Sequence, residues 1–386
     1  MRFSIIYEAQ TVDTSREAEA ALFHELIEQS VLAEALDFDC VWAVEHTALK
    51  QYAHMTAPET FLAFLAGKTT RLHVGHGVVC LPPAMNHPIK VAERIATLDI
   101  LSRGRLHFGI GKGGSQQEAG AFGYELAALA PMIDESMYLI PKILVQDEIE
   151  HDGRYIKIPR RPINPKPYQR PHPPMYLACT RADSLVTAGS RGLGALMFGF
   201  GGPEDVAEKN AIYRKAFRGR RADEQVGFRP NEHLAALCPA VVLDDRELAR
   251  RIGLRGQRFF VESLGHWYNN GPAPCTDDLD SEAHLRALAE VKSLYTAALR
   301  GENAVLPRDL AGYFGEVKDS YGTPEDCIRY VGHLIDSGAD EILFLLQMGT
   351  VPHAAIMQTI RNVGTRVIPH FRGPRPAVTA PDIPAS

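Results

Sequence analysis

The sequence lacks the features that would assign it to several specialised classes of protein. Its six cysteines show no CxxC spacing, and three of them lie in strand-like apolar runs, so free buried thiols are the simplest interpretation. There is no run of about 18 apolar residues and no basic N-terminal segment followed by a long apolar core. We therefore expect no membrane span and no targeting segment, and place the protein in the cytoplasm.

Long runs of one charge sign are also absent. The formal net charge is -6 at pH 7, and this balance argues against nucleic acid or an anionic membrane as the main partner. Small molecules or other proteins remain. With 386 residues, 45% hydrophobic and 23% charged, the chain can bury a large core as one large domain or two smaller ones.

Short apolar runs rich in β-branched residues alternate with longer amphipathic segments along most of the chain. The first four runs start about 33 residues apart, which is the length of one βα unit. Eight strands are predicted in all: 2–7, 40–44, 72–81, 105–111, 174–179, 193–200, 234–243 and 341–348. Helices are predicted between the later strands, over residues 181–191, 203–217, 246–263 and 323–337.

Near-continuous apolar strands that alternate with helices indicate a parallel sheet covered on its outer face. Eight such strands favour a closed (β/α)8 TIM barrel over an open doubly wound sheet. We therefore predict an α/β protein with a single barrel domain over residues 1–372.

Three stretches depart from this alternation. Residues 264–320 lengthen one βα connection far beyond the usual few residues, which predicts an extended lid insertion late in the chain. Residues 149–173 are too rich in proline for a helix and predict an extended crossing into the fifth strand. We expect the tail over residues 373–386 to be disordered.

Glu45 and His46 directly follow the apolar body of the second strand. Active sites of this architecture lie where the strands end at their C-terminal face, so both side chains should reach the mouth of the barrel. The alternative from position alone is a structural one, in which the carboxylate caps the next helix and the imidazole binds a backbone carbonyl.

Several separated motifs carry a resemblance over nearly the whole chain. They are FDCVWAVEH (38–46), LHVGHGVVCLP (72–82) with NHP (86–88), LDILSRGRLHFGIGKG (98–113), YLACT (176–180), GHWY (265–268) and GTPEDCI (322–328). The sequence resembles the bacterial luciferase-like family of flavin-dependent monooxygenases, with GHWY pointing to the alkanal monooxygenase (luciferase α subunit) branch. The resemblance implies a (β/α)8 barrel, a homodimer, and a reduced FMN supplied by a separate NAD(P)H:flavin reductase. That flavin would react with O2, and the resulting C4a-hydroperoxyflavin would oxidise an aldehyde or related carbonyl compound.

The resemblance also gives roles to individual residues. His46 matches a histidine taken to assist proton transfer, a task suited to an imidazole because its pKa lies near neutrality, and Glu45 would orient it or brace the neighbouring backbone. Gly77 and Val78 match the place of a non-proline cis peptide bond under the flavin ring. Gly111 stands where luciferase has a cysteine, and its missing side chain would leave room for the bound peroxide.

FGIGKGG (108–114) satisfies GxGxxG, but it lies at the fourth strand rather than in the first βα turn, so a Rossmann site is excluded. Lys112 also has the wrong spacing for a P-loop. By resemblance, Lys112 replaces an arginine that contacts the FMN phosphate, while Ala130 falls where a second phosphate arginine stands; Arg181 is a candidate substitute.

The remaining candidate residues rest on the resemblance as well. Thr180 and Ser184 match hydroxyl groups at the helix start that binds the phosphate, although Thr180 to Asp183 also reads as a plain capping box. The other positions expected at the cofactor are Ala178, Cys179, Met197 and Phe198, and Trp267 would form an apolar wall of the substrate slot.

Other functions stay open at this point. The same fold could bind the deazaflavin F420 for hydride transfer, or could hold a flavin without turnover. A metal-dependent barrel hydrolase would need ligands on several strand ends, and the first strand offers none, so we predict no metal site.

Overall fold

The computed structural model describes residues 1–274 and 320–372, and it has a closed barrel of eight parallel strands at its centre. Around the ring the strands follow the order β1-β12-β9-β8-β7-β4-β3-β2. Their bounds are β1 (Arg2–Tyr7), β2 (Cys40–Ala43), β3 (His73–Cys80), β4 (Leu106–Gly111), β7 (Met175–Cys179), β8 (Gly194–Met197), β9 (Leu234–Pro239) and β12 (Glu341–Leu345). Each lies within one of the eight predicted stretches, so the predicted TIM barrel is confirmed.

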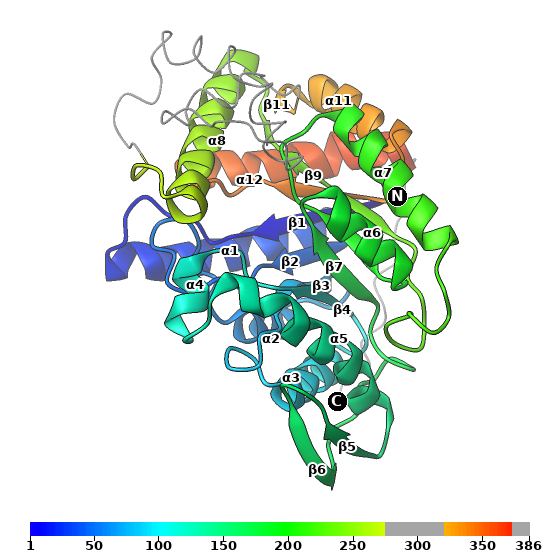
Figure 1. The fold of residues 1–386 in the computed structure, drawn as a ribbon. Helices are drawn as coiled ribbons and strands as arrows, with labels where there is room; N and C mark the ends of the chain where they lie inside the picture. Colours follow the sequence, from blue (N-terminus) through cyan, green and yellow to red (C-terminus); the bar gives the residue numbers. More distant parts are fainter. Residues whose placement is uncertain (275–319, 373–386) are drawn as a thin grey trace, which may run out of the picture.

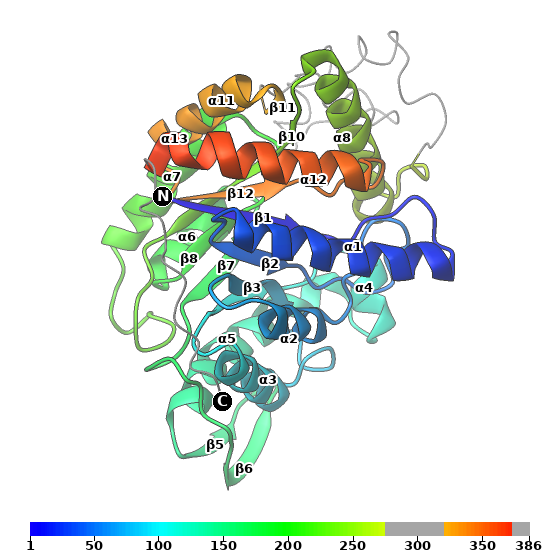
Figure 2. The same cartoon turned by 180° about the vertical axis from the view of Figure 1, so that it is seen from behind.

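Helices cover the outside of this ring, as Figures 1 and 2 show from opposite sides. They are α1 (Arg16–Ala35), α2 (Pro58–Lys68), α3 (Pro88–Leu101), α4 (Gln116–Ala121), α5 (Leu129–Val145), α6 (Ala182–Ser190), α7 (Pro203–Arg218), α8 (Arg246–Asn269), α11 (Pro324–Asp336), α12 (His353–Asn362) and α13 (Ile368–Arg372), with short turns η1 (Leu126–Ala128) and η3 (Val363–Val367). No helix within the described ranges is long and apolar enough to cross a membrane.

Local sequence explains where several of these helices begin. Proline stands in the first turn of α2, α3, α7 and α11, where its missing N–H would have had no partner within the helix. Ser15 accepts a hydrogen bond from the Ala18 amide at the start of α1, and Thr323 and Asp326 form a capping box at the start of α11.

Two parts of the fold differ from the sequence prediction. The proline-rich stretch before β7 contains an antiparallel hairpin of β5 (Glu148–Asp152) and β6 (Lys157–Pro162). Two further short strands, β10 (Val241–Val242) and β11 (Tyr321–Gly322), pair with each other outside the barrel. Helix α8 also continues to Asn269, six residues beyond its predicted end, so the GHWY motif belongs to its last turns and not to the predicted lid. The rest of that lid, residues 275–319, and the tail lie outside the described residues.

Five cysteines are free and buried in the described chain, namely Cys40, Cys80, Cys179, Cys238 and Cys327, as expected; Cys275 lies outside it. The barrel interior also holds a buried polar cluster near the amino ends of its strands. Glu341 accepts hydrogen bonds from Trp42 Nε1 at 2.8 Å and interacts with His233 Nε2 at 2.8 Å. Such groups are tolerated in a core because each finds a partner.

Candidate active site

A histidine held between two carboxylates lies at the carboxyl end of the barrel. His46 follows β2, and its Nδ1 lies 2.8 Å from Glu118 Oε1, while its Nε2 lies 3.4 Å from Glu8 Oε2. The backbone amide of His46 donates to the Met55 carbonyl at 3.1 Å. Both ring nitrogens therefore face a carboxylate, and the imidazole has a defined orientation.

Glu118 comes from α4, a short helix that the sequence prediction did not include. Ser115 caps this helix, and Glu118 Oε2 receives hydrogen bonds from the Ser115 hydroxyl at 2.9 Å and the Ser115 amide at 3.1 Å. Burial alone would raise the pKa of Glu118, but the His46 interaction and these hydrogen bonds bring it below its usual value. Glu118 is thus ionised at neutral pH and accepts a hydrogen bond from His46 Nδ1.

Glu8 has a different environment. It follows β1 directly, is buried, and its Oε2 has no hydrogen-bond partner among the residues that the structure describes. Burial raises the pKa of Glu8 to about 7, against the opposing effect of His46 and with a further rise from Glu118. Two carboxylates beside one imidazole thus differ in their affinity for a proton, as is common where groups exchange protons.

Aromatic side chains border the histidine. The Tyr52 ring lies 5.4 Å from the His46 ring, and Tyr268, from the last turn of α8, packs edge-on against Tyr52 at 6.1 Å. Tyr268 also lies against Gly114, because a Cβ atom added there would be 2.3 Å from the Tyr268 ring. The Tyr268 ring of α8 therefore packs between Tyr52 and the start of α4. Helices α8 and α4 lie at the same end of the barrel (Figure 1).

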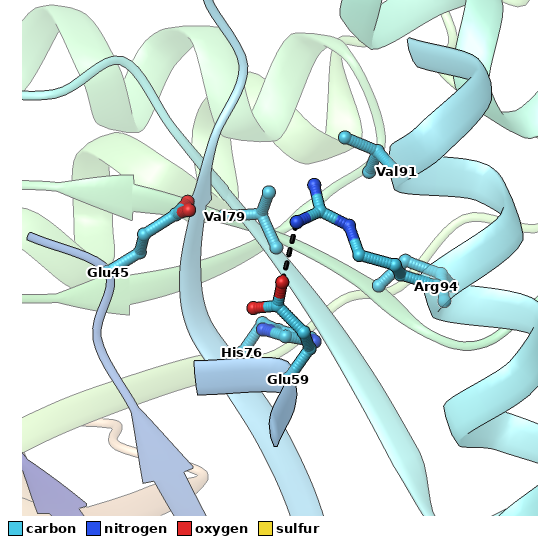
Figure 3. A pocket seen from close by; sticks show the side chains of 7 residues that line it. Glu45, Glu59, His76, Val79, Val91 and Arg94 are labelled. Carbon is cyan, nitrogen blue, oxygen red and sulfur yellow. Dashed lines mark hydrogen bonds and ion pairs between the residues drawn. The ribbon is translucent and has the colours of Figure 1, made fainter. Parts of the chain in front are cut away.

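Glu45 does not contact the imidazole of its neighbour. Its carboxylate accepts hydrogen bonds from the Cys80 amide at 2.6 Å and from Asn86 Nδ2 at 2.9 Å. Figure 3 shows Glu45 beside a small pocket on the outer side of β3, where Glu59 pairs with Arg94 at 2.6 Å. Of the two roles expected for Glu45, these contacts match bracing of the backbone, while Glu118 and Glu8 are the groups that orient His46.

His76 lines the same pocket from β3 (Figure 3). It is buried, and neither ring nitrogen has a hydrogen-bond partner in the described part of the chain. Burial lowers the pKa of His76 to about 4, so the imidazole is neutral at pH 7.

Three of the residues expected beside the flavin lie close together, Gly77 and Val78 within β3 and Gly111 at the end of β4. The peptide bond between Gly77 and Val78 is cis, as the resemblance led us to expect. A Cβ atom added at Gly111 would lie 2.2 Å from Val78 Cγ2. The space that we expected Gly111 to leave open is therefore filled by the Val78 side chain.

The expected phosphate-side residues lie near the start of α6. Lys112 and Thr180 are exposed, and Ser184 is half-buried. The predicted capping box of Thr180 and Asp183 is wrong by one residue, because Arg181 is the N-cap and its amide donates to Ser184 Oγ at 3.2 Å. Ser184 is thus partly engaged by its own helix start.

A charged pair flanks that helix start. Burial alone would raise the pKa of Asp183, but the Arg181 hydrogen bond, the Ser184 amide and the positive charges of Arg181 and Lys112 bring it below its usual value. Lys112 is therefore close enough to the start of α6 for its charge to act on Asp183.

The last predicted residues divide into buried and surface-facing ones. Cys179 and Met197 are buried, and burial raises the pKa of the Cys179 thiol to about 12, so it is a neutral packing residue. Ala178 and Phe198 are half-buried at the strand ends, and Phe198 packs 6.1 Å from Phe260. Trp267 donates from Nε1 to the Lys50 carbonyl at 3.1 Å, which joins α8 to the loop after β2.

Sequence reasoning missed Glu8, Glu118 and Tyr52, which border His46, and Tyr268, which packs on Tyr52. A signal existed for Glu8, which ends the run RFSIIYE at the first strand's carboxyl end just as Glu45 does at the second. Ser115 followed by Glu118 also matches the capping-box pattern. Nothing local distinguishes Tyr268 from its neighbours in GHWY.

A parallel barrel that presents a histidine and two carboxylates at its carboxyl end has the arrangement found in (β/α)8 enzymes. The chain belongs to the luciferase-like monooxygenase family, since the model of that family matches residues 1–341.

Two curated relatives show how far the likeness extends. The oxygenase component of the flavin-dependent trigonelline monooxygenase of Acinetobacter baylyi is 28% identical over 281 residues, 70% of this chain and 72% of that protein. The alkanal monooxygenase alpha chain of Photorhabdus laumondii is 24% identical over 313 residues, 81% of this chain and 82% of that one. Other matches span only about half of the relative, 48% and 46% of two such proteins.

Solved structures share the fold. The oxygenating constituent of 3,6-diketocamphane monooxygenase from Pseudomonas putida, in complex with FMN, has a TM-score of 0.70 at 18% identity, over 96% of this chain and 98% of that one. The coenzyme F420 dependent tetrahydromethanopterin reductase of Methanopyrus kandleri has a TM-score of 0.66 at 21% identity, over 96% and 99%. At these identities the likeness concerns the fold alone.

Proposed function

We propose that the protein is the oxygenase of a two-component flavin-dependent monooxygenase, which uses reduced FMN and O2 to oxidise an aldehyde or a related small carbonyl compound. The observation that carries the proposal is His46, held between Glu118 and Glu8 at the barrel mouth beside aromatic side chains. The relative from A. baylyi is itself an oxygenase component, which supports a separate flavin reductase as the partner that delivers the cofactor.

The residues at the mouth fit a flavin mononucleotide. Gly77 and Gly111 carry no side chain, but Trp42 and Val78 already occupy the space beside them, so the fit to the cofactor rests on the phosphate side. Lys112 offers an exposed ammonium near the start of α6, where backbone N–H groups favour an anion such as the FMN phosphate. Bound there, reduced FMN would supply the electrons that activate O2.

The chain's own residues would hold a proton and exclude water. Burial lowers the pKa of His46, but the Glu118 hydrogen bond and the charges of Glu8 and Glu118 outweigh burial and raise it above its usual value. His46 would therefore hold a transferable proton more firmly than a free imidazole does, at the barrel end where the substrate carbonyl would sit. Tyr52 and Tyr268 shield this cluster from solvent, which protects a reactive flavin from unproductive loss of peroxide.

The test is anaerobic mixing of the protein with photoreduced FMN, followed by addition of oxygen while candidate aldehydes, ketones and amines are screened. We expect a long-lived absorbance transient and an oxygenated product formed in proportion to the FMN oxidised. Immediate return to oxidised FMN, with all oxygen released as hydrogen peroxide whatever substrate is present, would refute the proposal.

The second candidate is an F420-dependent oxidoreductase, because a neighbour of the same fold is a coenzyme F420 dependent reductase. Equilibrium binding of oxidised F420 and of FMN, followed by quenching of protein fluorescence, separates the two. Tight binding of FMN with no oxygen use after reduction would instead indicate a flavin-binding barrel without turnover. We also propose a homodimer, which light scattering of the purified chain tests directly.

A further inference from the structure

We propose that Glu8 is a positioning residue that sets the protonation state of His46, by sharing one proton with Nε2 while Glu118 holds the proton on Nδ1. This inference deepens the proposed function and rests on it for the role of His46. It gives Glu8 a task that neither the family match nor the named relatives assign.

Glu118 fixes the Nδ1 side of the His46 ring. Its Oε2 is held by the Ser115 hydroxyl and amide, and its Oε1 is left for His46 Nδ1 at 2.8 Å. A carboxylate that already accepts these hydrogen bonds is ionised, so Nδ1 must be the donor. The only site of His46 whose proton can vary is then Nε2.

Within residues 1–274 and 320–372, His46 Nε2 faces the Glu8 carboxylate and has no other polar partner. The Nε2 to Oε2 distance is 3.4 Å, and Oε2 has no hydrogen-bond partner there. Glu8 is 1% exposed. Burying a carboxylate oxygen without a hydrogen bond costs free energy of folding. Glu8 Oε2 avoids this cost if it shares a proton with His46 Nε2, the polar atom that it faces.

With Glu118 ionised and one proton shared between Glu8 and Nε2, the cluster carries one negative charge. Binding of a second proton gives a protonated Glu8 beside an imidazolium, and the cluster then has no net charge. Burial opposes the charged state, so Glu8 and His46 bind their last proton as a pair and titrate together rather than independently.

Three other titratable groups lie near this pair. Burial raises the pKa of Tyr268 and of Cys80 well above their usual values, so both stay neutral. Burial also raises the pKa of Glu45, against the hydrogen bonds from Asn86 and the Cys80 amide, and the Glu45 charge adds to the rise of the His46 pKa. The Tyr52 phenol ring packs on His46 from the loop after β2.

The experiment compares wild type with E8Q, which keeps the shape of the side chain and removes its proton exchange. Histidine labelled with carbon-13 at Cε1 reports the titration of His46 by NMR, with the signal assigned through His46→Gln. We expect the apparent pKa of His46 to fall by about one unit in E8Q, because an acidic neighbour is lost. The pH dependence of the amount of product formed per FMN oxidised should shift to lower pH by the same amount.

The control is E19Q. Glu19 pairs with His54 Nδ1 at 3.0 Å on the surface, so this variant removes a glutamate from a different histidine and should leave the His46 signal and the pH limb unchanged. Glu8→Asp keeps a carboxylate and should recover part of the wild-type pKa. If E8Q does not fold, Glu8→Asp is compared with wild type, and a smaller downward shift is expected.

Each outcome decides something. An unchanged His46 titration in folded E8Q, or in Glu8→Asp if E8Q does not fold, overturns the inference even if the protein proves to be a monooxygenase. A downward shift of the NMR titration in a protein that shows no oxygen chemistry supports the proton sharing and refutes the proposed function instead. The two failures are therefore distinguishable, because the NMR measurement needs neither flavin nor substrate.

Discussion

The contact between Gly111 and Val78 makes a prediction that can be worked through in numbers. In Gly111→Ala the new Cβ would lie 2.2 Å from Val78 Cγ2, well inside the ordinary contact distance, so Val78 or the β4 backbone must move. Gly111 is buried on a barrel strand, where such overpacking costs about 1–3 kcal/mol of the free energy of unfolding. We expect G111A to lose an amount in this range.

The double variant tests the cause. Val78→Ala removes the clashing Cγ atoms, so G111A/V78A should be more stable than the sum of the two single changes by about 1–2 kcal/mol. Gly67→Ala in α2 is the matched control, because no atom lies within 4 Å of its new Cβ; it should be neutral or stabilising by about 0.5 kcal/mol.

The assay is urea denaturation followed by fluorescence and circular dichroism, with coincident transitions required before free energies are compared. Equal stability of G111A and wild type would refute the packing argument. Additive losses in the double variant would show that Val78 is not the group displaced.

Three further predictions concern charged groups. Burial raises the pKa of Glu341, but His233 and Arg2 lower it to about 2 from the usual 4.5, so the ionised form contributes stability that is complete above pH 4.5 and is lost as the pH falls towards 2. The shift corresponds to about 3 kcal/mol of the free energy of unfolding. E341Q should therefore be less stable at pH 7, and its stability should change less with pH below 4.5. The exposed Glu150→Gln should show neither effect in the same urea titrations. Lys112→Ala should weaken FMN binding roughly tenfold and Lys112→Arg should not, and equal dissociation constants by fluorescence would remove Lys112 from the phosphate site. His46→Ala should keep reduced-FMN affinity near normal and lower product yield per flavin oxidised, and unchanged coupled turnover would exclude His46 from proton transfer.

The barrel could be predicted from the sequence because its signal is local. Runs such as RFSIIY and EILFLLQM are mostly apolar, and strands buried on both faces need that composition. Their spacing and number then favour one architecture. The hairpin of β5 and β6 was missed because EIEHD and KIPRRP each bury only one side chain, an isoleucine, and β6 also contains two prolines.

The site was predicted only in part, for a physical reason. The position of His46 at the end of β2 fixed its place at the mouth of the barrel, since a parallel strand carries the residues that follow it to that end. Which groups contact its two nitrogens depends on residues 38 positions before it and 72 after it. Only the pairing of β1, β2, β3 and β4 in the barrel wall brings Glu8, His46 and Glu118 together, and their burial separates the proton affinities of two otherwise equivalent glutamates.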